Sequence, residues 1–286
     1  MTISFTKMHG AGNDFIVIDD RHENFPDHNA ALIRQIAARR TGVGCEGVIL
    51  FRPALNDATC DYRMVFLNPD GSRASMCGNA TRCLALFAFD NGTGGRVQRI
   101  GTDAGIVVAE ILTSSAGFGT VCVQMPPPHG RRESVRVALP DGRGVNCFYV
   151  DTGVPHVVVF VNDVAAVDVA GDGRAIRTAE AFVPAGANVD FVQIMPDGSA
   201  LVRTYERGVE AESGACGTGA AAVGVAMAES RGCALPVSLQ FSSGDILIVD
   251  GQVDASGQCC SVRLTGPAQK VFEGRLQMRW LSGEDA

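Results

Sequence analysis

The chain has 286 residues, of which 46% are hydrophobic and 19% charged, so it can bury a large core and disorder is excluded as its main state. Its 24 basic and 31 acidic residues give a formal charge of −7, which disfavours nucleic-acid binding because phosphate recognition needs a basic face. The two lysines, Lys7 and Lys270, leave only two positions for a pyridoxal phosphate Schiff base.

Short strands dominate the predicted secondary structure. In chain order, we expect strands at residues 3–8 and 15–19, an amphipathic helix at 29–40, and a second helix that begins just after Asn79 and runs through Ala88. Strands at 106–111, 121–125 and 157–161, a third helix over 220–229 and a strand at 246–249 follow. The second and third helices are apolar nearly all round, which is typical of a helix buried on all sides, as inside a sheath of strands.

These two apolar helices resemble each other. One begins after Met76-Cys-Gly-Asn79 and the other after Ala215-Cys-Gly-Thr218, about half the chain apart. This repetition predicts a duplicated domain, with the run Pro126–Pro128 as the hinge between the halves. No apolar run approaches about 18 residues and the first residues lack the apolar core of a signal peptide, so we expect no membrane span and a cytoplasmic protein.

Two of the ten cysteines have a distinctive context. In a long chain without a signal peptide, ten cysteines indicate free thiols rather than a disulfide framework, and most should be small buried apolar residues. Cys77 and Cys216, however, each lie where a loop enters a helix. The free N–H groups and the dipole of a helix N-terminus stabilise an anion, so we expect the pKa of both thiols to be lowered.

Three kinds of chemistry would suit a pair of such thiols. They could form a dithiol–disulfide couple or a metal site. They could also work as acid and base on opposite faces of one carbon, which inverts a stereocentre without a cofactor. The repeat favours the third reading, because forward and reverse reactions then exchange the roles of the two groups. The structural alternative is that both cysteines merely pack at helix starts.

Six segments, in order along nearly the whole chain, resemble the signatures of the diaminopimelate epimerase family. They are Met8–Phe15, Asn68–Arg82, Pro155-His156, Asn188, Glu206–Gly208 with Ala215–Gly219, and Leu264–Phe272. The resemblance implies an α/β (α+β) fold of two pseudo-symmetric domains with the active site between them. Each would be a strongly curved, mostly antiparallel β-sheet or barrel around a central helix. The implied domains are residues 1–125 with 272–286, and residues 126–271.

The resemblance also implies an activity: the cofactor-independent interconversion of LL- and meso-diaminopimelate, a step towards lysine and peptidoglycan. Cys77 and Cys216 would be the acid/base pair, supported by His156 and Glu206. The partner would be a small-molecule amino-acid substrate, with no metal, no nucleic acid and no membrane involved, and family analogy suggests a homodimer.

Substrate-binding positions follow from the same resemblance. The N–H groups of Gly78, Asn79, Gly217 and Thr218 would bind the α-carboxylate, as helix N-termini bind anions. The other matching residues are Asn13, Asn68, Asn188, Glu206 and Arg207. Arg207 would pair with a substrate carboxylate. By themselves, Asn13 and Asn188 also fit turns, Arg207 a solvated surface charge, and His156 a core histidine.

Three places depart from the usual family pattern. Val154 stands where many members have an asparagine that contacts substrate, and Gly47 stands near the position of a family glutamine. The segment Val209–Gly214 differs from the common form before the second cysteine and is one residue longer. Because such changes can alter specificity while sparing the chemistry, a two-cysteine racemase of another amino acid, such as histidine, stays open. A thiol redox protein and a non-catalytic binding module are further alternatives.

Overall fold

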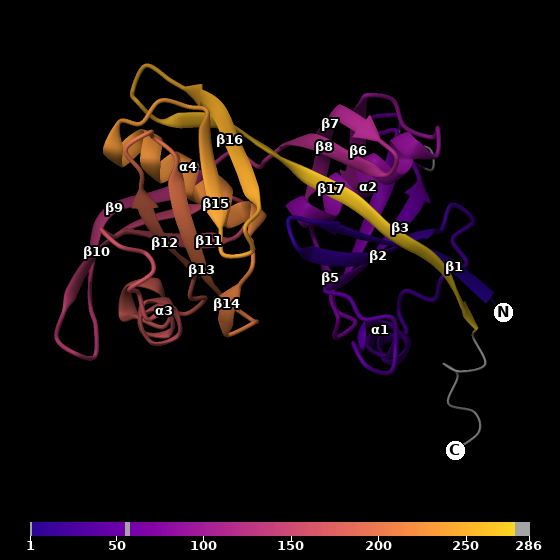
Figure 1. The fold of residues 1–286 in the computed structure, drawn as a ribbon, viewed down its shortest axis with the longest axis horizontal. Coiled ribbons are helices and arrows are strands. Elements are labelled where there is room, and N and C mark those ends of the chain that lie inside the picture. The colour runs from indigo at the N-terminus through magenta and orange to yellow at the C-terminus, as the bar shows by residue number, and fades with distance from the viewer. Residues whose placement is uncertain (1, 55–57, 278–286) are drawn as a thin grey trace. The chain divides into compact units, whose positions relative to one another are not determined.

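The computed structural model describes residues 2–54 and 58–277, which form two compact units (Figure 1). The N-terminal unit comprises residues 2–123 and 266–277, and the C-terminal unit comprises residues 124–265. The chain thus leaves the first unit after Val123 and returns to it after Thr265. The domain limits inferred from sequence, after residues 125 and 271, remain a prediction.

The described strands of the N-terminal unit close into a barrel. The ring runs β1, β2, β3, β4, β6, β7, β8 and the second part of β17, which pairs back with β1. The pairs β2–β3 and β4–β6 are parallel, whereas β1–β2, β3–β4, β6–β7, β7–β8 and β1–β17 are antiparallel, and the short β5 pairs with β4. The bounds are β1 Thr2–Gly10, β2 Asn13–Asp19, β3 Gly47–Pro53, β4 Tyr62–Leu67, β5 Arg73–Ala74, β6 Val97–Thr102, β7 Gly105–Ser115, β8 Phe118–Gln124 and β17 Cys259–Gln277.

The C-terminal unit repeats this order. Its strands run β9, β10, β11, β12, β13, β15, β16 and the first part of β17, with β14 paired to β13. The parallel pairs β11–β12 and β13–β15 occupy the places of β2–β3 and β4–β6. The mostly antiparallel, duplicated α/β fold predicted from the sequence is therefore confirmed. The bounds are β9 His129–Ala138, β10 Gly144–Asp151, β11 Pro155–Phe160, β12 Asn188–Ile194, β13 Ala200–Glu206, β14 Ala211–Ser213, β15 Val237–Phe241 and β16 Ile246–Val253.

Each unit surrounds one helix with strands (Figure 1). Helix α2 (Gly78–Asp90) packs against β1, β2, β3, β4 and β7, and α4 (Gly217–Arg231) packs against β10, β11, β12 and β16. Residues 78–86 of α2 and 219–227 of α4 are buried without interruption. The apolar composition of both helices is thus explained by contact with strands on all sides.

Two shorter helices cover the outside of the strands. Helix α1 (Ala30–Ala37) is shorter than the predicted 29–40, because Asn29 is its N-cap, accepting from the Leu32 N–H at 3.0 Å, and Ala38 is already extended. Helix α3 (Val169–Arg177) was not predicted and occupies the same place in the second unit, between β11 and β12, ahead of a 3₁₀ helix at Glu180–Phe182. Of the described residues, none belongs to a helix long and apolar enough to cross a bilayer.

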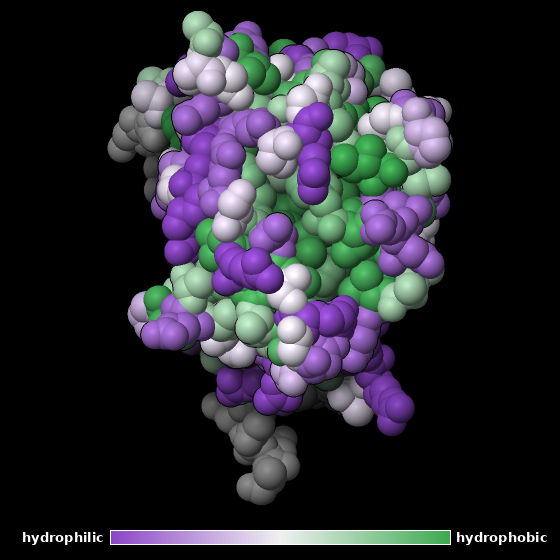
Figure 2. Space-filling view, turned by 90° about the vertical axis from the view of Figure 1, so that its left-hand side faces the viewer, coloured by the Kyte–Doolittle hydropathy of each residue, from purple (hydrophilic) through white to green (hydrophobic). Residues whose placement is uncertain are grey.

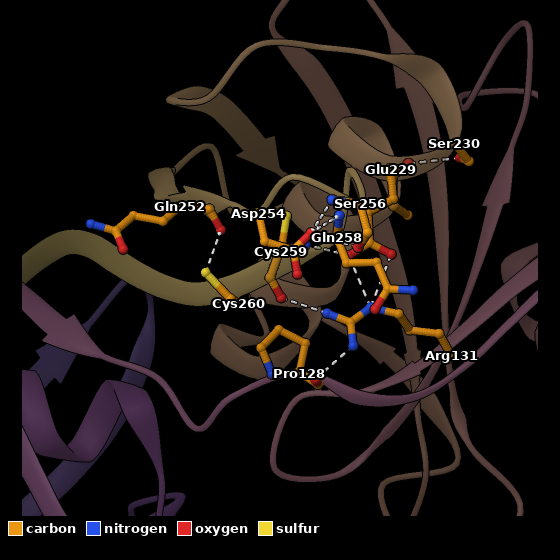
Figure 3. Close-up of polar contacts among 11 residues, drawn as sticks. Pro128, Arg131, Glu229, Ser230, Gln252, Asp254, Ser256, Gln258, Cys259 and Cys260 are labelled. Carbon is orange, nitrogen blue, oxygen red and sulfur yellow. Dashed lines mark hydrogen bonds and ion pairs between the residues drawn. The ribbon is translucent and has the colours of Figure 1, made fainter.

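A buried ion pair ties the beginning of the C-terminal unit to its end (Figure 3). Arg131 on β9 donates through Nε to both carboxylate oxygens of Glu229 on α4, at 2.9 and 3.0 Å. Its Nη1 donates to the Pro128 carbonyl at 2.8 Å and its Nη2 to the Cys259 carbonyl at 2.5 Å. The Glu229 carboxylate, only 3% exposed, also accepts from the Cys259 N–H at 2.7 Å. Arg131 therefore joins the Pro-rich segment, α4 and β17 at one point.

The face of the C-terminal unit that Figure 2 shows has exposed apolar side chains. Polar residues surround an apolar centre on the face drawn there. The cluster that packs with α3 includes the half-buried Val135, Val145 and Tyr149 of β9 and β10. Helix α3 thus covers its sheet only in part.

Candidate functional site

Cys77 is the N-cap of the central helix α2. Its backbone is extended (φ −141°, ψ 119°), and the helix begins at Gly78. The Cys77 carbonyl accepts from the N–H and the hydroxyl of Thr81, at 2.9 and 2.8 Å. The side chain is half-buried. The sulfur therefore lies at the positive end of a buried helix, where Gly78 and Asn79 contribute first-turn N–H groups.

Two predicted substrate-binding asparagines meet at this helix start. The Asn79 amide donates through Nδ2 to Oδ1 of Asn13 at 3.1 Å. Asn13 lies at the beginning of β2 and donates through its own Nδ2 to the carboxylate of Glu46. Asn68 lies apart from this chain of contacts, in a turn after β4 where its Nδ2 donates to the Ser72 hydroxyl at 2.9 Å. The structure thus joins Asn13 and Asn79 directly and places Asn68 in a turn.

Cys216 is the N-cap of α4, the matching helix of the C-terminal unit. Its sulfur accepts from the Gly219 N–H at 3.4 Å and lies 3.4 Å from the Thr218 hydroxyl. A Cβ at position 219 would lie 3.2 Å from the Cys216 Cβ and 2.6 Å from a carboxylate oxygen of Asp190. Glycine at 219 is therefore what allows the sulfur, the helix start and this carboxylate to pack together.

His156 links this helix start to a buried carboxylate. Its ring is fully buried on β11, with Nδ1 2.7 Å from Oδ2 of Asp190 and Nε2 2.9 Å from the Thr218 hydroxyl. Oδ1 of Asp190 accepts from the Thr204 hydroxyl at 2.7 Å. Burial alone would lower the pKa of His156, but the Asp190 carboxylate outweighs it and, with a smaller contribution from Cys216, raises that pKa to about 10. The Asp190 carboxylate therefore favours the charged form of the ring.

This shift makes the stability of the protein depend on pH with a definite sign. The folded state holds the His156 proton up to about pH 10, whereas an unfolded histidine releases it near 6.5. The contribution of His156 to stability is complete below pH 6.5 and is lost as the pH rises towards 10. We expect urea unfolding to show a larger loss of stability between pH 6.5 and 9 for the wild type than for His156→Gln. Parallel losses in the two proteins would contradict the assignment.

Asn188 contacts the same histidine and connects it to the backbone of Arg207. Asn188, at the start of β12, lies with Nδ2 3.2 Å from Nε2 of His156, and its Oδ1 accepts from the Arg207 N–H at 2.8 Å. The Arg207 guanidinium donates through Nη1 to the Ala185 carbonyl at 2.9 Å. Glu206 is the half-buried last residue of β13. Cys216, Gly217, Thr218, His156 and Asn188 thus form one connected group, and Arg207 joins it through its backbone.

Four other cysteines lie in settings that keep them inert. All ten cysteines are thiols rather than disulfides. Burial raises the pKa of the Cys83 and Cys147 thiols to about 12 and that of Cys45 and Cys259 to about 11. These four stay protonated at neutral pH, as expected for core residues. The described residues hold no group of three or more histidine, cysteine, aspartate or glutamate side chains arranged to bind a metal.

The departures from the family pattern have local structural reasons. A Cβ at Gly47 would lie 2.4 Å from the Phe66 ring, so any side chain there would need Phe66 to move. In the segment 209–214, Arg203 holds Glu212 through two hydrogen bonds of 2.8 and 2.6 Å. Glu210 accepts from the Gly208 N–H at 3.0 Å and pairs with Arg177 at 2.8 Å. The longer segment is therefore fixed by its own two carboxylates.

Sequence reasoning missed Asp190, the residue that gives His156 its charge. A lone aspartate inside the apolar run Val189-Asp-Phe-Val192 was the available signal, because a carboxylate is rarely buried unless it is paired. Thr204, its second partner, had no distinguishing signal within β13.

Comparison with known proteins gives a consistent family. The family model described as diaminopimelate epimerase matches residues 5–129 and 148–271. A protein of Aquifex aeolicus (strain VF5) named diaminopimelate epimerase is 41% identical, covering 96% of this chain and 98% of its own. One of the same name from Hydrogenobaculum sp. (strain Y04AAS1) is 39% identical, covering 95% and 97%.

Solved structures share the fold at low identity. A phenazine biosynthesis protein of the PhzF family from Bacillus anthracis gives a TM-score of 0.74 at 15% identity, covering 97% of this chain and 99% of its own. A probable proline racemase from Agrobacterium radiobacter K84, with bound carbonate, gives 0.72 at 19%, covering 96% and 93%. At such identities the likeness establishes the two-domain fold alone.

Proposed function

The chain belongs to the diaminopimelate epimerase family, and from this membership we propose that it interconverts LL- and meso-diaminopimelate with Cys77 and Cys216 as the acid/base pair. The observation that carries the proposal is that each cysteine is the N-cap of the buried central helix in one of two repeated units. The same backbone position is thus built twice, once for each thiol, which suits a reaction in which the two groups exchange roles.

In the proposed reaction one sulfur accepts a proton from the substrate and the other sulfur donates a proton to it. One cysteine, as thiolate, takes the α-proton, and the C–H electron pair passes into the substrate α-carbon and its carboxylate. The other cysteine, as thiol, gives its proton to the opposite face of that carbon and becomes the thiolate. The stereocentre is inverted, no electron is gained or lost, and the two sulfurs have exchanged protonation states.

Backbone N–H groups are proposed to hold the α-carboxylate. Those of Gly78 and Asn79 in one unit, and of Gly217 and Thr218 in the other, belong to first helical turns. Such donors stabilise the charge that builds up on the carboxylate as the α-proton leaves. Five side chains complete the proposed binding set: Asn13, Asn68, Asn188, Glu206 and Arg207.

His156 is proposed to act through Cys216. A protonated ring beside the start of α4 favours negative charge on the neighbouring sulfur, with the Thr218 hydroxyl between them. Glu206 is proposed to support the cysteines as well, as its family position implies.

A second candidate substrate follows from Val154. Where a polar side chain that binds the distal part of diaminopimelate is replaced by an apolar one, another amino acid could be preferred. Histidine is the alternative we test alongside diaminopimelate.

Hydrogen exchange in deuterated water tests the chemistry and the substrate together. We expect the enzyme, without added metal or pyridoxal phosphate, to wash deuterium into the α-position of diaminopimelate faster than into histidine, glutamate or lysine. Preference for histidine would change the substrate and keep the chemistry. A disulfide that forms and breaks in each turnover, with no α-exchange, would instead establish a redox protein.

A homodimer, which rests on family analogy, and a cytoplasmic location complete the proposal. Light scattering on the purified protein tests the homodimer, and fractionation of the producing cells tests the cytoplasmic location.

A further inference from the structure

Helix α2 contains a fully buried arginine one turn after Asn79. Arg82 is 0% exposed and is the largest fully buried side chain of the described residues. Its Nη2 donates to Oδ1 of Asn79 at 2.9 Å and its Nε to the Pro267 carbonyl at 3.3 Å. Burying a guanidinium is unfavourable unless its hydrogen bonds are met, so these two acceptors reduce the cost of placing it inside the unit.

The arginine determines the orientation of two amides in turn. A guanidinium has only donors, so Asn79 must present Oδ1 to it and therefore turns Nδ2 towards Asn13. Asn13 must then present Oδ1 to Asn79, at 3.1 Å, and its Nδ2 points to the Glu46 carboxylate. An ionised carboxylate only accepts, so Arg82 at one end and Glu46 at the other require the same orientation of the two amides. We call this series of hydrogen bonds the Arg82 relay.

The packing leaves little freedom for this relay. Asn79 is 3% exposed. A Cβ at Gly10, in the first family signature, would lie 3.2 Å from the Asn79 carbonyl oxygen and 3.4 Å from Nη2 of Arg82. Glycine at position 10 therefore gives the strand room to lie directly against the arginine and the asparagine.

We propose that Arg82 is a positioning residue that, through Asn79 and together with Glu46, holds the Asn13 amide in one orientation for the substrate, with Oδ1 towards Asn79 and Nδ2 towards Glu46. The inference rests on the proposed function, in which Asn13 contacts the substrate. Only one of the two Nδ2 hydrogens of Asn13 can point to a given Glu46 oxygen, so the same relay also sets the direction of the other hydrogen.

The variant Asn79→Asp tests the relay without removing the arginine. The aspartate still offers an oxygen to Arg82 but has no donor for Asn13, so Oδ1 of Asn13 loses its hydrogen bond and the amide lies between two carboxylates that both only accept. We expect KM for diaminopimelate to rise about tenfold, with kcat changed less than about threefold, because a ground-state contact is lost. Asn91→Asp makes the same change at the far end of the helix and should leave both constants unchanged.

Substitutions at Arg82 distinguish the effect of its hydrogen-bond donors from the effect of its bulk. Arg82→Lys keeps a charged group with donors only and should keep KM within about threefold of the wild type, whereas Arg82→Met keeps apolar bulk and should raise KM as Asn79→Asp does. If Arg82→Met does not fold, the Asn79 variant still decides. A KM unchanged in Asn79→Asp would overturn the inference.

Asn13→Ala distinguishes this inference from the proposed function. If Asn13→Ala raises KM and adding Asn79→Asp raises it no further, the relay is supported. Independent, multiplicative effects of the two substitutions would overturn the relay alone. A normal KM in Asn13→Ala would overturn both the substrate contact of Asn13 and the relay that depends on it.

Discussion

Alanine in place of Cys77 is expected to lower the rate of stereochemical inversion by about 10²–10⁴-fold, and alanine in place of Cys216 should do the same. Each substitution leaves one thiol able to exchange a proton on one face and none able to deliver a proton to the other. Inversion is then lost, whereas the surviving thiol can still take the α-proton of one stereoisomer and return deuterium to the same face.

The two variants should therefore differ in which stereoisomer they exchange. We expect Cys77→Ala to wash deuterium without inversion into one isomer of diaminopimelate and Cys216→Ala into the other, as followed by proton NMR in deuterated water. Cys83→Ala is the matched control, because Cys83 lies on the same helix as Cys77 and its high pKa keeps it a thiol. Normal inversion in either N-cap variant would refute the two-cysteine mechanism.

The helices show which features a local sequence pattern predicts and which it does not. The apolar sequences of α2 and α4 predicted burial on all sides, because the polarity of each side chain indicates whether its position is buried or exposed. Helix α3 escaped prediction, since Gly171 and Gly173 lower its local helix propensity. A Cβ at Gly173 would lie 2.5 Å from the Tyr205 Cβ, so glycine lets the helix pack closely on β13, and tertiary contact outweighs propensity.

The candidate site divides in the same way. The cysteines at helix starts could be found from sequence because a cap is a local feature. Asp190 could not be joined to His156 beforehand, because their contact depends on the parallel pairing of β11 with β12. The Arg82 relay likewise joins a helix, the start of β2 and Pro267 near the end of the chain. The His156–Asp190 contact and the Arg82 relay both depend on contacts between elements far apart in the sequence, which no local pattern encodes.

Replacing Asp190 with asparagine is expected to lower kcat by about 10²–10³-fold while the protein stays folded. The corresponding change in the Ser-His-Asp triad of hydrolases lowers kcat about 10⁴-fold, and we expect a smaller loss here because His156 supplies a charge beside Cys216 and takes no proton from it. Asparagine keeps the shape and the contact with Thr204, but it removes the negative charge that keeps His156 protonated. The sulfur of Cys216 then loses the positive charge beside it.

NMR titration of the His156 ring connects this loss of activity to its cause. In the wild type the ring should stay protonated up to about pH 10, whereas in Asp190→Asn only the smaller contribution of Cys216 opposes burial and the ring should lose its proton well below pH 10. Asp250→Asn, which removes a half-exposed carboxylate paired with Arg263 in the same unit, is the control and should leave both kcat and the titration unchanged. A wild-type rate in Asp190→Asn, with the ring neutral at pH 7, would mean that Cys216 works without a charged histidine. The role proposed for His156 would then have to be abandoned, although the pair of thiols would not.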